Sequence, residues 1–335
     1  MEDHRIRVLE PPEGIPAKNM PVLTALLDRS TLTAGTITVA TGLLVVLGAV
    51  LAVSGGYGIA VPSALLVLMT PSALYFGYSA LAGSSSMRKL TGKPFRLVSG
   101  LDGALVAGSR VSVPLDGRWL VMRLPVPLLA QLAARRRLWV LGRFFVLPGV
   151  VVPRRGAVRD KPVKGSVPFA FEPVSPGRML ATQRRLLSAY YFIGVVMLLV
   201  ASAFGFWTSA DYPRRDSVVV RSASVFGYGC AVGAVGLAIV AVVLLRKLPE
   251  PRWTELAVVS GPASVNLFGM VTCKGRTVLP GGREVTVTAG GSDPSLAANI
   301  AATGRLWVLG EPAAGKTAQA GVPGYAVFGP VRFGR

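Results

Sequence analysis

The sequence predicts an α+β membrane protein with four transmembrane helices in two hairpins, each hairpin followed by a small, mostly β cytoplasmic module. The first supporting observation is composition: 51% of the 335 residues are apolar and only 16% are charged, against about 25% charged in soluble domains. The second is a set of four uncharged runs, at about 33–53, 57–81, 187–207 and 223–245. Each run is long enough to cross the roughly 30 Å hydrocarbon core of a bilayer. The third is an internal repeat.

The repeat is the hexapeptide Arg-Leu-Trp-Val-Leu-Gly, which occurs at 137–142 and again at 305–310. Long internal repeats indicate a copied structural unit. We therefore expect a tandem duplication of one hairpin plus one β module. Two shorter matches occur in the same order in both halves: Arg-Lys-Leu at 88–90 and 246–248, and Val-Ser-Gly at 98–100 and 259–261.

The boundaries follow from the repeat and from the composition of the segments between the apolar runs. The first 32 residues are polar and contain prolines, which is typical of a flexible or surface-lying arm. A stretch rich in Pro, Lys and Gly after the first module indicates a linker. The expected order is a cytoplasmic arm (1–32), transmembrane hairpin 1 (33–82), basic β module 1 (83–156), a linker (157–186), transmembrane hairpin 2 (187–245) with an outer loop (208–222), and β module 2 (246–335).

Each β module consists of short apolar runs bounded by turn signals such as Asp116-Gly117, a pattern typical of antiparallel strands. One helix is expected in the first module, at Val126–Arg136. The two tryptophans of the repeated hexapeptide, Trp139 and Trp307, are expected to be buried core residues. The expected strands are Phe95–Val98, Ala104–Val106, Arg110–Val113, Trp119–Leu124, Leu138–Leu141 and Val150–Val152 in the first module, and Leu256–Val259, Ser264–Phe268, Arg276–Leu279, Glu284–Thr288, Leu306–Leu309 and Tyr325–Phe328 in the second.

The charge distribution predicts the orientation in the membrane. Residues 83–186 contain 19 basic and 4 acidic side chains, and residues 246–335 contain 10 and 5. The outer loop contains only 3 and 2. Because basic residues accumulate on the cytoplasmic side of a membrane, we expect both termini and both modules in the cytoplasm. The abundance of Arg, Ala, Val and Gly favours a bacterial source, and hence a multi-pass protein of the inner membrane.

Residues Gly310–Thr317 match the phosphate-binding pattern GxxxxGK[ST]. That site requires a helix directly after the loop, whose N-terminus holds the phosphates. Here Gly321, Pro323 and Gly324 follow within a few residues and disfavour a helix. We interpret the match as fortuitous and expect a β-turn with a solvated Lys316.

Groups that carry catalysis are scarce. His4 is the single histidine, which excludes His-based triads and most His-ligated metal sites. The four apolar runs contain no carboxylate or lysine that would mark an ion pathway. Cys230 and Cys273 are expected to be unpaired thiols that behave as small apolar residues. The sequence therefore predicts a protein that is not an enzyme, without catalytic residues, cofactor or metal.

Basic side chains gather at the predicted membrane ends and around the first hexapeptide. Three interpretations stay open: a solvated or positive-inside face, contact with anionic lipid headgroups, and binding of nucleic acid, for which stacking aromatic residues are few. The candidate lipid-contact residues are Arg88, Lys89, Arg135, Arg136, Arg137, Arg154, Arg155, Arg184, Arg185, Arg246 and Lys247.

The expected function follows from the predicted membrane helices and the shortage of catalytic groups. We expect an integral membrane scaffold or interaction subunit whose duplicated β modules bind a protein partner or each other. One alternative is a small-solute channel or transporter built from the four helices. The other is docking of anionic lipid or nucleic acid through the basic module.

Overall fold

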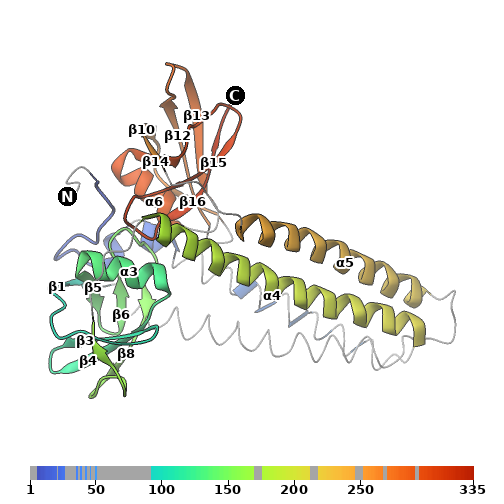
Figure 1. The fold of residues 1–335 in the computed structure, drawn as a ribbon, viewed down its shortest axis with the longest axis horizontal. Helices are drawn as coiled ribbons and strands as arrows, with labels where there is room; N and C mark the ends of the chain where they lie inside the picture. The colour runs from blue at the N-terminus through green and yellow to red at the C-terminus, as the bar shows by residue number, and fades with distance from the viewer. Residues whose placement is uncertain are drawn as a thin grey trace. The chain divides into compact units, whose positions relative to one another are not determined.

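The computed structural model describes residues 6–20, 22–26, 92–169, 176–211, 218–245, 252–266, 270–290 and 294–335, together with scattered positions between 35 and 50. The chain divides into two compact units. Unit 1 comprises Met1–Thr33, Ala82–Thr182 and Pro249–Arg335, and unit 2 comprises Ala34–Leu81 and Gln183–Leu248. The described strands all belong to unit 1 (Figure 1).

Residues 92–169, the first β part, contain the strands β1 (Arg96–Ser99), β2 (Leu105–Ala107), β3 (Arg110–Leu115), β4 (Arg118–Arg123), β5 (Arg137–Leu141), β6 (Phe144–Val146), β7 (Arg154–Arg155), β8 (Ala157–Arg159) and β9 (Val167–Pro168), with helix α3 (Val126–Arg135) between β4 and β5. The strands form two antiparallel sheets. The four-stranded sheet has the order β1-β5-β6-β7, and the five-stranded sheet has the order β8-β4-β3-β2-β9.

The β3–β4 hairpin illustrates how the sequence forms these sheets. Val111 pairs with Met122 and Val113 pairs with Leu120 across the two strands, and all four side chains are buried. The intervening residues point to the other face, because successive side chains alternate along a strand. Asp116 and the following glycine both have positive φ angles, as a tight hairpin turn requires.

Helix α3 confirms the predicted helix at Val126–Arg136. Pro127 lies in its first turn, where a missing backbone N–H has no cost. The helix ends at Arg136, which adopts the left-handed conformation with a φ of 49°. Leu128 and Leu132 are buried in the core of the first β part.

Residues 252–335, the second β part, contain β10 (Trp253–Ser260), β11 (Ser264–Val265), β12 (Val271–Val278), β13 (Glu284–Gly290), helix α6 (Pro294–Thr303), β14 (Arg305–Leu309), β15 (Thr317–Gly321) and β16 (Phe328–Phe333). The strand order is β10-β14-β15-β16-β13-β12-β11, and β10 pairs additionally with β12. The sheet therefore closes on itself as a small barrel. Its interior contains apolar side chains such as Leu256, Val287, Trp307 and Phe333.

Barrel closure depends on strand β10 changing partners along its length. Its first part pairs with β14, whereas Val258–Ser260 pair with β12. Gly275 lies opposite Ser260 in that second pairing. A Cβ atom at Gly275 would lie 2.7 Å from Val258 Cγ1 and 2.8 Å from the Val259 carbonyl oxygen. Only glycine allows the two backbones to approach this closely.

Unit 2 contains the helices α4, which spans Pro176–Asp211 and begins in unit 1, and α5 (Val218–Leu245). The two helices lie side by side in opposite directions (Figure 1). Near one end, Ser188 Oγ donates a hydrogen bond to the Ala241 carbonyl oxygen (3.0 Å). Near the other, Ser202 Oγ donates to the Gly227 carbonyl oxygen (2.8 Å). These pairings define an antiparallel helical hairpin.

The N-terminal residues do not form a loose arm over 6–26. The short 3-10 helix η1 (Ala17–Asn19) lies beside the start of the first β part, because Ala17 N donates to the Lys93 carbonyl oxygen (3.1 Å). Ala17 and Leu23 are buried in one apolar cluster with Phe95 and Trp139. This segment, the N-terminal segment, is part of the core of unit 1.

The predicted architecture of four transmembrane helices with duplicated β modules is wrong. The described residues contain two helices long and apolar enough to cross a membrane, within α4 and α5. The predicted first hairpin, 33–82, lies outside the described residues apart from scattered positions between 35 and 50. The two β parts also differ, since one forms a closed barrel and the other two open sheets.

The repeated hexapeptide nevertheless forms a strand in both β parts, β5 and β14. Each strand follows a ten-residue helix, α3 or α6. Each helix ends in a residue with positive φ, Arg136 or Gly304. The identity therefore reports a shared local helix–strand conformation, and not a copied module. Trp139 and Trp307 are both buried, as predicted.

We predict that Gly275→Ala lowers the free energy of unfolding of the barrel by about 1–3 kcal/mol, because the new methyl group overlaps the β10 backbone. Urea unfolding of the purified chain, followed by tryptophan fluorescence, measures the change. Gly261→Ala is the matched control, since a Cβ atom there meets nothing within 4 Å. Equal stability of the two variants would contradict the role of Gly275 in closure.

Candidate functional site

The most distinctive polar feature of unit 1 is a buried junction between its two β parts. Three polar side chains form it: Gln131 on α3, and Ser295 and Asn299 on α6. All three are at most 2% exposed. Buried polar groups are costly unless they are hydrogen-bonded, so their partners explain why they occur here.

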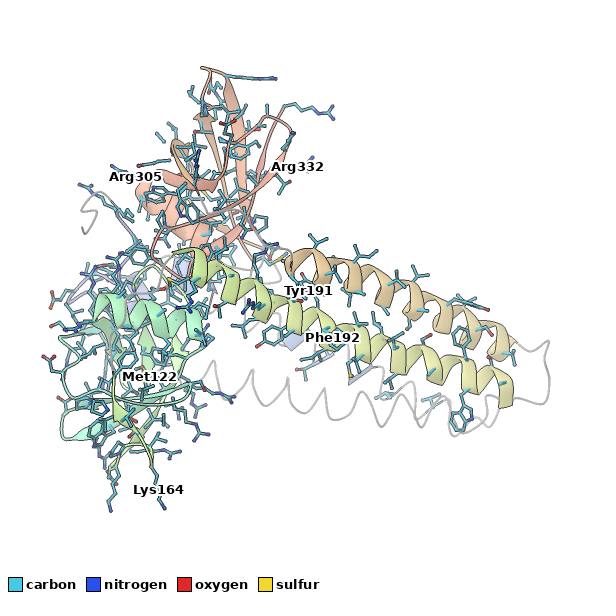
Figure 2. All side chains as sticks on the ribbon, in the orientation of Figure 1. Met122, Lys164, Tyr191, Phe192, Arg305 and Arg332 are labelled. Atoms are coloured by element: carbon cyan, nitrogen blue, oxygen red, sulfur yellow. The ribbon has the colours of Figure 1, made fainter. Side chains whose placement is uncertain are left out.

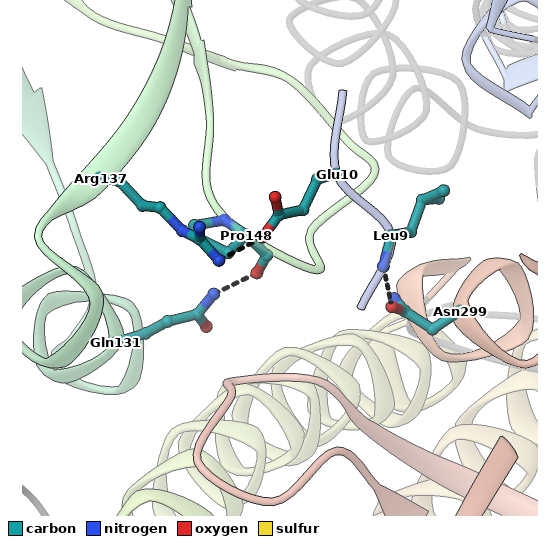
Figure 3. Close-up of polar contacts among 6 residues, drawn as sticks. All are labelled: Leu9, Glu10, Gln131, Arg137, Pro148 and Asn299. Carbon is teal, nitrogen blue, oxygen red and sulfur yellow. Dashed lines mark hydrogen bonds and ion pairs between the residues drawn. The ribbon is translucent and has the colours of Figure 1, made fainter. Parts of the chain in front are cut away.

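Asn299 connects three segments of the chain. Its Oδ1 accepts a hydrogen bond from the backbone N–H of Leu9 (2.7 Å). Its Nδ2 donates to the carbonyl oxygen of Gly149 (2.7 Å) and to that of Ser295 (2.6 Å). Gly149 N in turn donates to the Leu9 carbonyl oxygen (2.9 Å). The N-terminal segment is thereby bonded to both β parts through the backbone of one residue, Leu9; Figure 3 shows its bond to Asn299.

Gln131, on α3 of the first β part, forms the second connection by bonding to one backbone group in each β part. Its Nε2 donates to the Pro148 carbonyl oxygen, also in the first β part (Figure 3). Its Oε1 accepts a hydrogen bond from the backbone N–H of Ala326 in the second β part (2.7 Å). Ser295 Oγ completes the junction by accepting from Val151 N (3.2 Å). The two β parts are therefore joined by directional bonds to backbone groups.

Charged groups border this junction. Arg137 Nη2 lies 2.5 Å from Glu10 Oε1 (Figure 3), and the Arg135 guanidinium lies 4.2 Å from the centroid of the Tyr325 ring. Burial raises the pKa of the Tyr325 hydroxyl above its ordinary value, while the positive charges of Arg135 and Arg137 act in the opposite direction. The phenol is therefore protonated at neutral pH and acts as an apolar and cation-binding surface.

The junction is suited to holding chain segments together. Its side chains are amides, a hydroxyl and an ion pair whose described partners lie within the chain itself. Within the described ranges, no group of three or more His, Cys, Asp or Glu side chains could hold a metal ion. Cys230 and Cys273 are free thiols, and burial raises the pKa of Cys273, so this thiol is protonated and unreactive at neutral pH.

The Walker-like residues Gly310–Thr317 connect strands β14 and β15 of the barrel. The turn is closed by a hydrogen bond from Lys316 N to the Ala313 carbonyl oxygen (3.2 Å), and the Lys316 side chain is exposed. Thr317 begins a strand, where a phosphate-binding loop would open into a helix. The local geometry is that of a β connection.

The α4–α5 hairpin is the second candidate site, because its surface is apolar all round. Phe192, Val200 and Trp207 on α4 are each about 60% exposed, at 62%, 63% and 58%, and Tyr191 and Phe192 lie on the same helix (Figure 2). Val232 on α5 is 73% exposed. Soluble proteins rarely leave so large a contiguous apolar surface in water. A lipid environment removes this cost.

The two ends of the apolar part of α4 carry the side chains expected at a membrane interface. Arg184 Nη2 donates a hydrogen bond to the Val243 carbonyl oxygen in the last turn of α5 (2.9 Å). A carbonyl group at the helix C-terminus is thereby paired with a cationic donor. Tyr190 follows about two turns later, and Trp207 lies 17 residues beyond Tyr190. That separation corresponds to about 26 Å of helix, close to the thickness of a hydrocarbon core.

The described members of the predicted lipid-contact set lie on several different elements of the two units. Arg135 and Arg137 border the junction, Arg136 ends α3, and Arg154 and Arg155 form β7. Arg184 and Arg185 lie on α4 in unit 2. The remaining four, Arg88, Lys89, Arg246 and Lys247, lie outside the described residues.

The three junction residues were not predicted from the sequence, although a signal for two of them was present. Gln131 lies in the run Leu-Leu-Ala-Gln-Leu-Ala-Ala, and Asn299 in the run Leu-Ala-Ala-Asn-Ile-Ala-Ala. A single amide within an apolar helix indicates a buried polar contact. The helix containing Asn299 was itself overlooked, despite Asp293-Pro294 at its start, which is a typical N-terminal signal.

We predict that Asn299→Ala lowers the free energy of unfolding of unit 1 by about 2–4 kcal/mol, since it leaves the half-buried N–H of Leu9 and the buried carbonyl of Gly149 without their partner. The N-terminal segment should also detach more often, and tryptic cleavage after the exposed Arg7 should become faster. Asn19→Ala, at an exposed position, is the control. Unchanged cleavage in Asn299→Ala would show that the junction does not hold the segment.

Comparisons with known proteins do not assign this chain to a family. No family model matches it, and neither a curated protein nor a solved structure matches it significantly. The junction and the apolar hairpin are therefore the features from which a function is inferred.

Proposed function

We propose that the protein is a membrane-anchored interaction protein: the α4–α5 hairpin crosses a membrane, and the β parts of unit 1 bind a protein partner. The observation that carries this proposal is the exposed apolar surface of the hairpin, bordered by Arg184 at one end and Trp207 at the other. In the most apolar windows of both helices only 17% of the residues are buried, whereas the core helices of soluble proteins are mostly buried.

The chain connectivity supports placing all of unit 1 on one side of the membrane. Unit 1 contains the N-terminal segment, the first β part and the second β part in one packed body. An antiparallel hairpin enters and leaves a membrane on the same side, so the segments before α4 and after α5 lie together. The excess of basic residues in these segments favours the cytoplasmic face of a cell membrane.

A protein partner is favoured by the outer surface of the barrel. Val259 and Val278 lie on the adjacent strands β10 and β12 and are 83% and 57% exposed. Both alternate with buried neighbours, so they point away from the barrel interior. We propose this pair, the β10–β12 surface, as the contact point of a scaffold that brings a soluble partner to the membrane.

We predict that Val200→Arg reduces membrane integration of the chain. A charged side chain in the middle of a transmembrane helix costs about 2.5–3.5 kcal/mol on the insertion scale, whereas the same change on a water-exposed helix costs nearly nothing. The fraction of chain resistant to alkaline extraction from membranes measures the effect. Ala210→Arg, three residues beyond Trp207, is the control. Wild-type resistance of Val200→Arg to alkaline extraction would contradict the membrane assignment.

We further predict that a photo-crosslinking amino acid at Val259 captures one defined protein in cells, and that the same amino acid at exposed Arg332 does not. Val259→Asp should abolish the crosslink from a second reporter at Val278, because a carboxylate disfavours an apolar contact. Recovery of lipid alone at both positions, with no protein, would contradict the scaffold proposal.

A further inference from the structure

A like-charge pair lies on the five-stranded sheet of the first β part. Arg110 on β3 and Arg123 on β4 are directly opposed in the antiparallel register, and both are exposed. Neither forms an ion pair within the described ranges. Two like charges in this arrangement destabilise a sheet. An anionic partner would remove this repulsion.

Further cations lie on the same face. Trp119 is opposed to Arg159 on β8, and Trp119 alternates onto the face that carries Arg123. The connection from β8 to β9 also crosses this face, because Val163 N donates to Ser112 Oγ (3.3 Å) and Ser112 is two residues from Arg110. We call this surface the basic face; it consists of Arg110, Trp119, Arg123 and Arg159, and the connection that crosses it contributes the exposed Lys161 and Lys164.

Among the residues that the structure describes, nearby acidic groups do not neutralise the basic face. Asp160 is the acidic residue in the connection, and it is paired with Arg118 (3.2 Å). Lys161 and Lys164 are exposed, and Lys164 projects from the end of the first β part (Figure 2). Residues 92–169 contain only three acidic side chains, Asp102, Asp116 and Asp160. The face therefore has an uncompensated positive charge.

We propose that the basic face binds the headgroups of anionic phospholipids. This inference rests on the proposed membrane anchor, which keeps unit 1 near a bilayer surface, where each Lys or Arg is attracted by the anionic leaflet. Trp119 is the kind of amphipathic aromatic side chain that is enriched at the headgroup level. Nucleic acid is disfavoured, because stacking platforms use several aromatic side chains and this face carries one.

Lysine labelling of the full chain in lipid nanodiscs tests the proposal. We expect an amine-reactive reagent to modify Lys161 and Lys164 roughly fivefold more slowly in discs of phosphatidylcholine mixed with phosphatidylglycerol than in discs of phosphatidylcholine alone. Lys274 and Lys316, both exposed on the barrel, are internal controls that should react equally in both. The Arg110→Gln/Arg123→Gln variant should lose the protection, and Arg283→Gln/Arg332→Gln should keep it.

Each outcome has a distinct meaning. Equal labelling of Lys161 and Lys164 in both discs overturns the lipid assignment, and protection by added single-stranded DNA in phosphatidylcholine discs, without protection by phosphatidylglycerol, assigns the face to nucleic acid. A chain that does not co-purify with the discs refutes the anchor instead. The same labelling with anionic vesicles added to that chain then still tests the basic face.

Discussion

Unit 1 depends on a small number of buried hydrogen bonds between side-chain amides and backbone groups. The Asn299 side chain bonds to the N–H of Leu9 and the carbonyl of Gly149. The Gln131 side chain bonds to the carbonyl of Pro148 and the N–H of Ala326. A backbone group buried without a partner costs about 1–3 kcal/mol, so losing these few contacts would weaken the packing of the N-terminal segment against the two β parts. Apolar contacts add area to the interface, but the amides define its register because hydrogen bonds are directional.

This constraint has a consequence for membrane topology. The junction joins segments that precede and follow the α4–α5 hairpin. If the hairpin crosses a membrane, segments that are hydrogen-bonded to each other cannot lie on opposite sides. The packing of unit 1 and the antiparallel pairing of the helices therefore both support a topology in which the segments before α4 and after α5 lie on one side of the membrane. Charge bias, an independent property of the sequence, then favours the cytoplasmic side.

Local patterns predict much of the fold. Helix α3, the apolar strands around each hexapeptide and the buried Trp139 and Trp307 follow from periodicity and turn residues, because these depend on near neighbours in the chain. The repeat is a different matter: six identical residues suggested a duplicated module, yet the two β parts close in different ways. Closure depends on β10 pairing with two strands, with Gly275 at the close approach, and no local pattern encodes that.

The candidate sites likewise differ in whether they depend on local or on long-range features of the chain. The apolar hairpin is visible in the sequence, since hydrophobicity is a local property. The junction and the basic face were not found, because Asn299 lies 290 residues from Leu9, and the opposition of Arg110 and Arg123 appears only once the strand register is known. Long-range pairing turns ordinary polar residues into structural or binding groups.

Hydrogen–deuterium exchange of the wild-type chain tests most directly whether the N-terminal segment and the two β parts form one cooperative body. The backbone amides of Leu9, Val151 and Ala326 should be protected, and with increasing urea they should open together with the barrel-core amide of Val308. Exchange of the Leu9 amide within seconds, while Val308 stays protected, would contradict a single body held by the Asn299 junction.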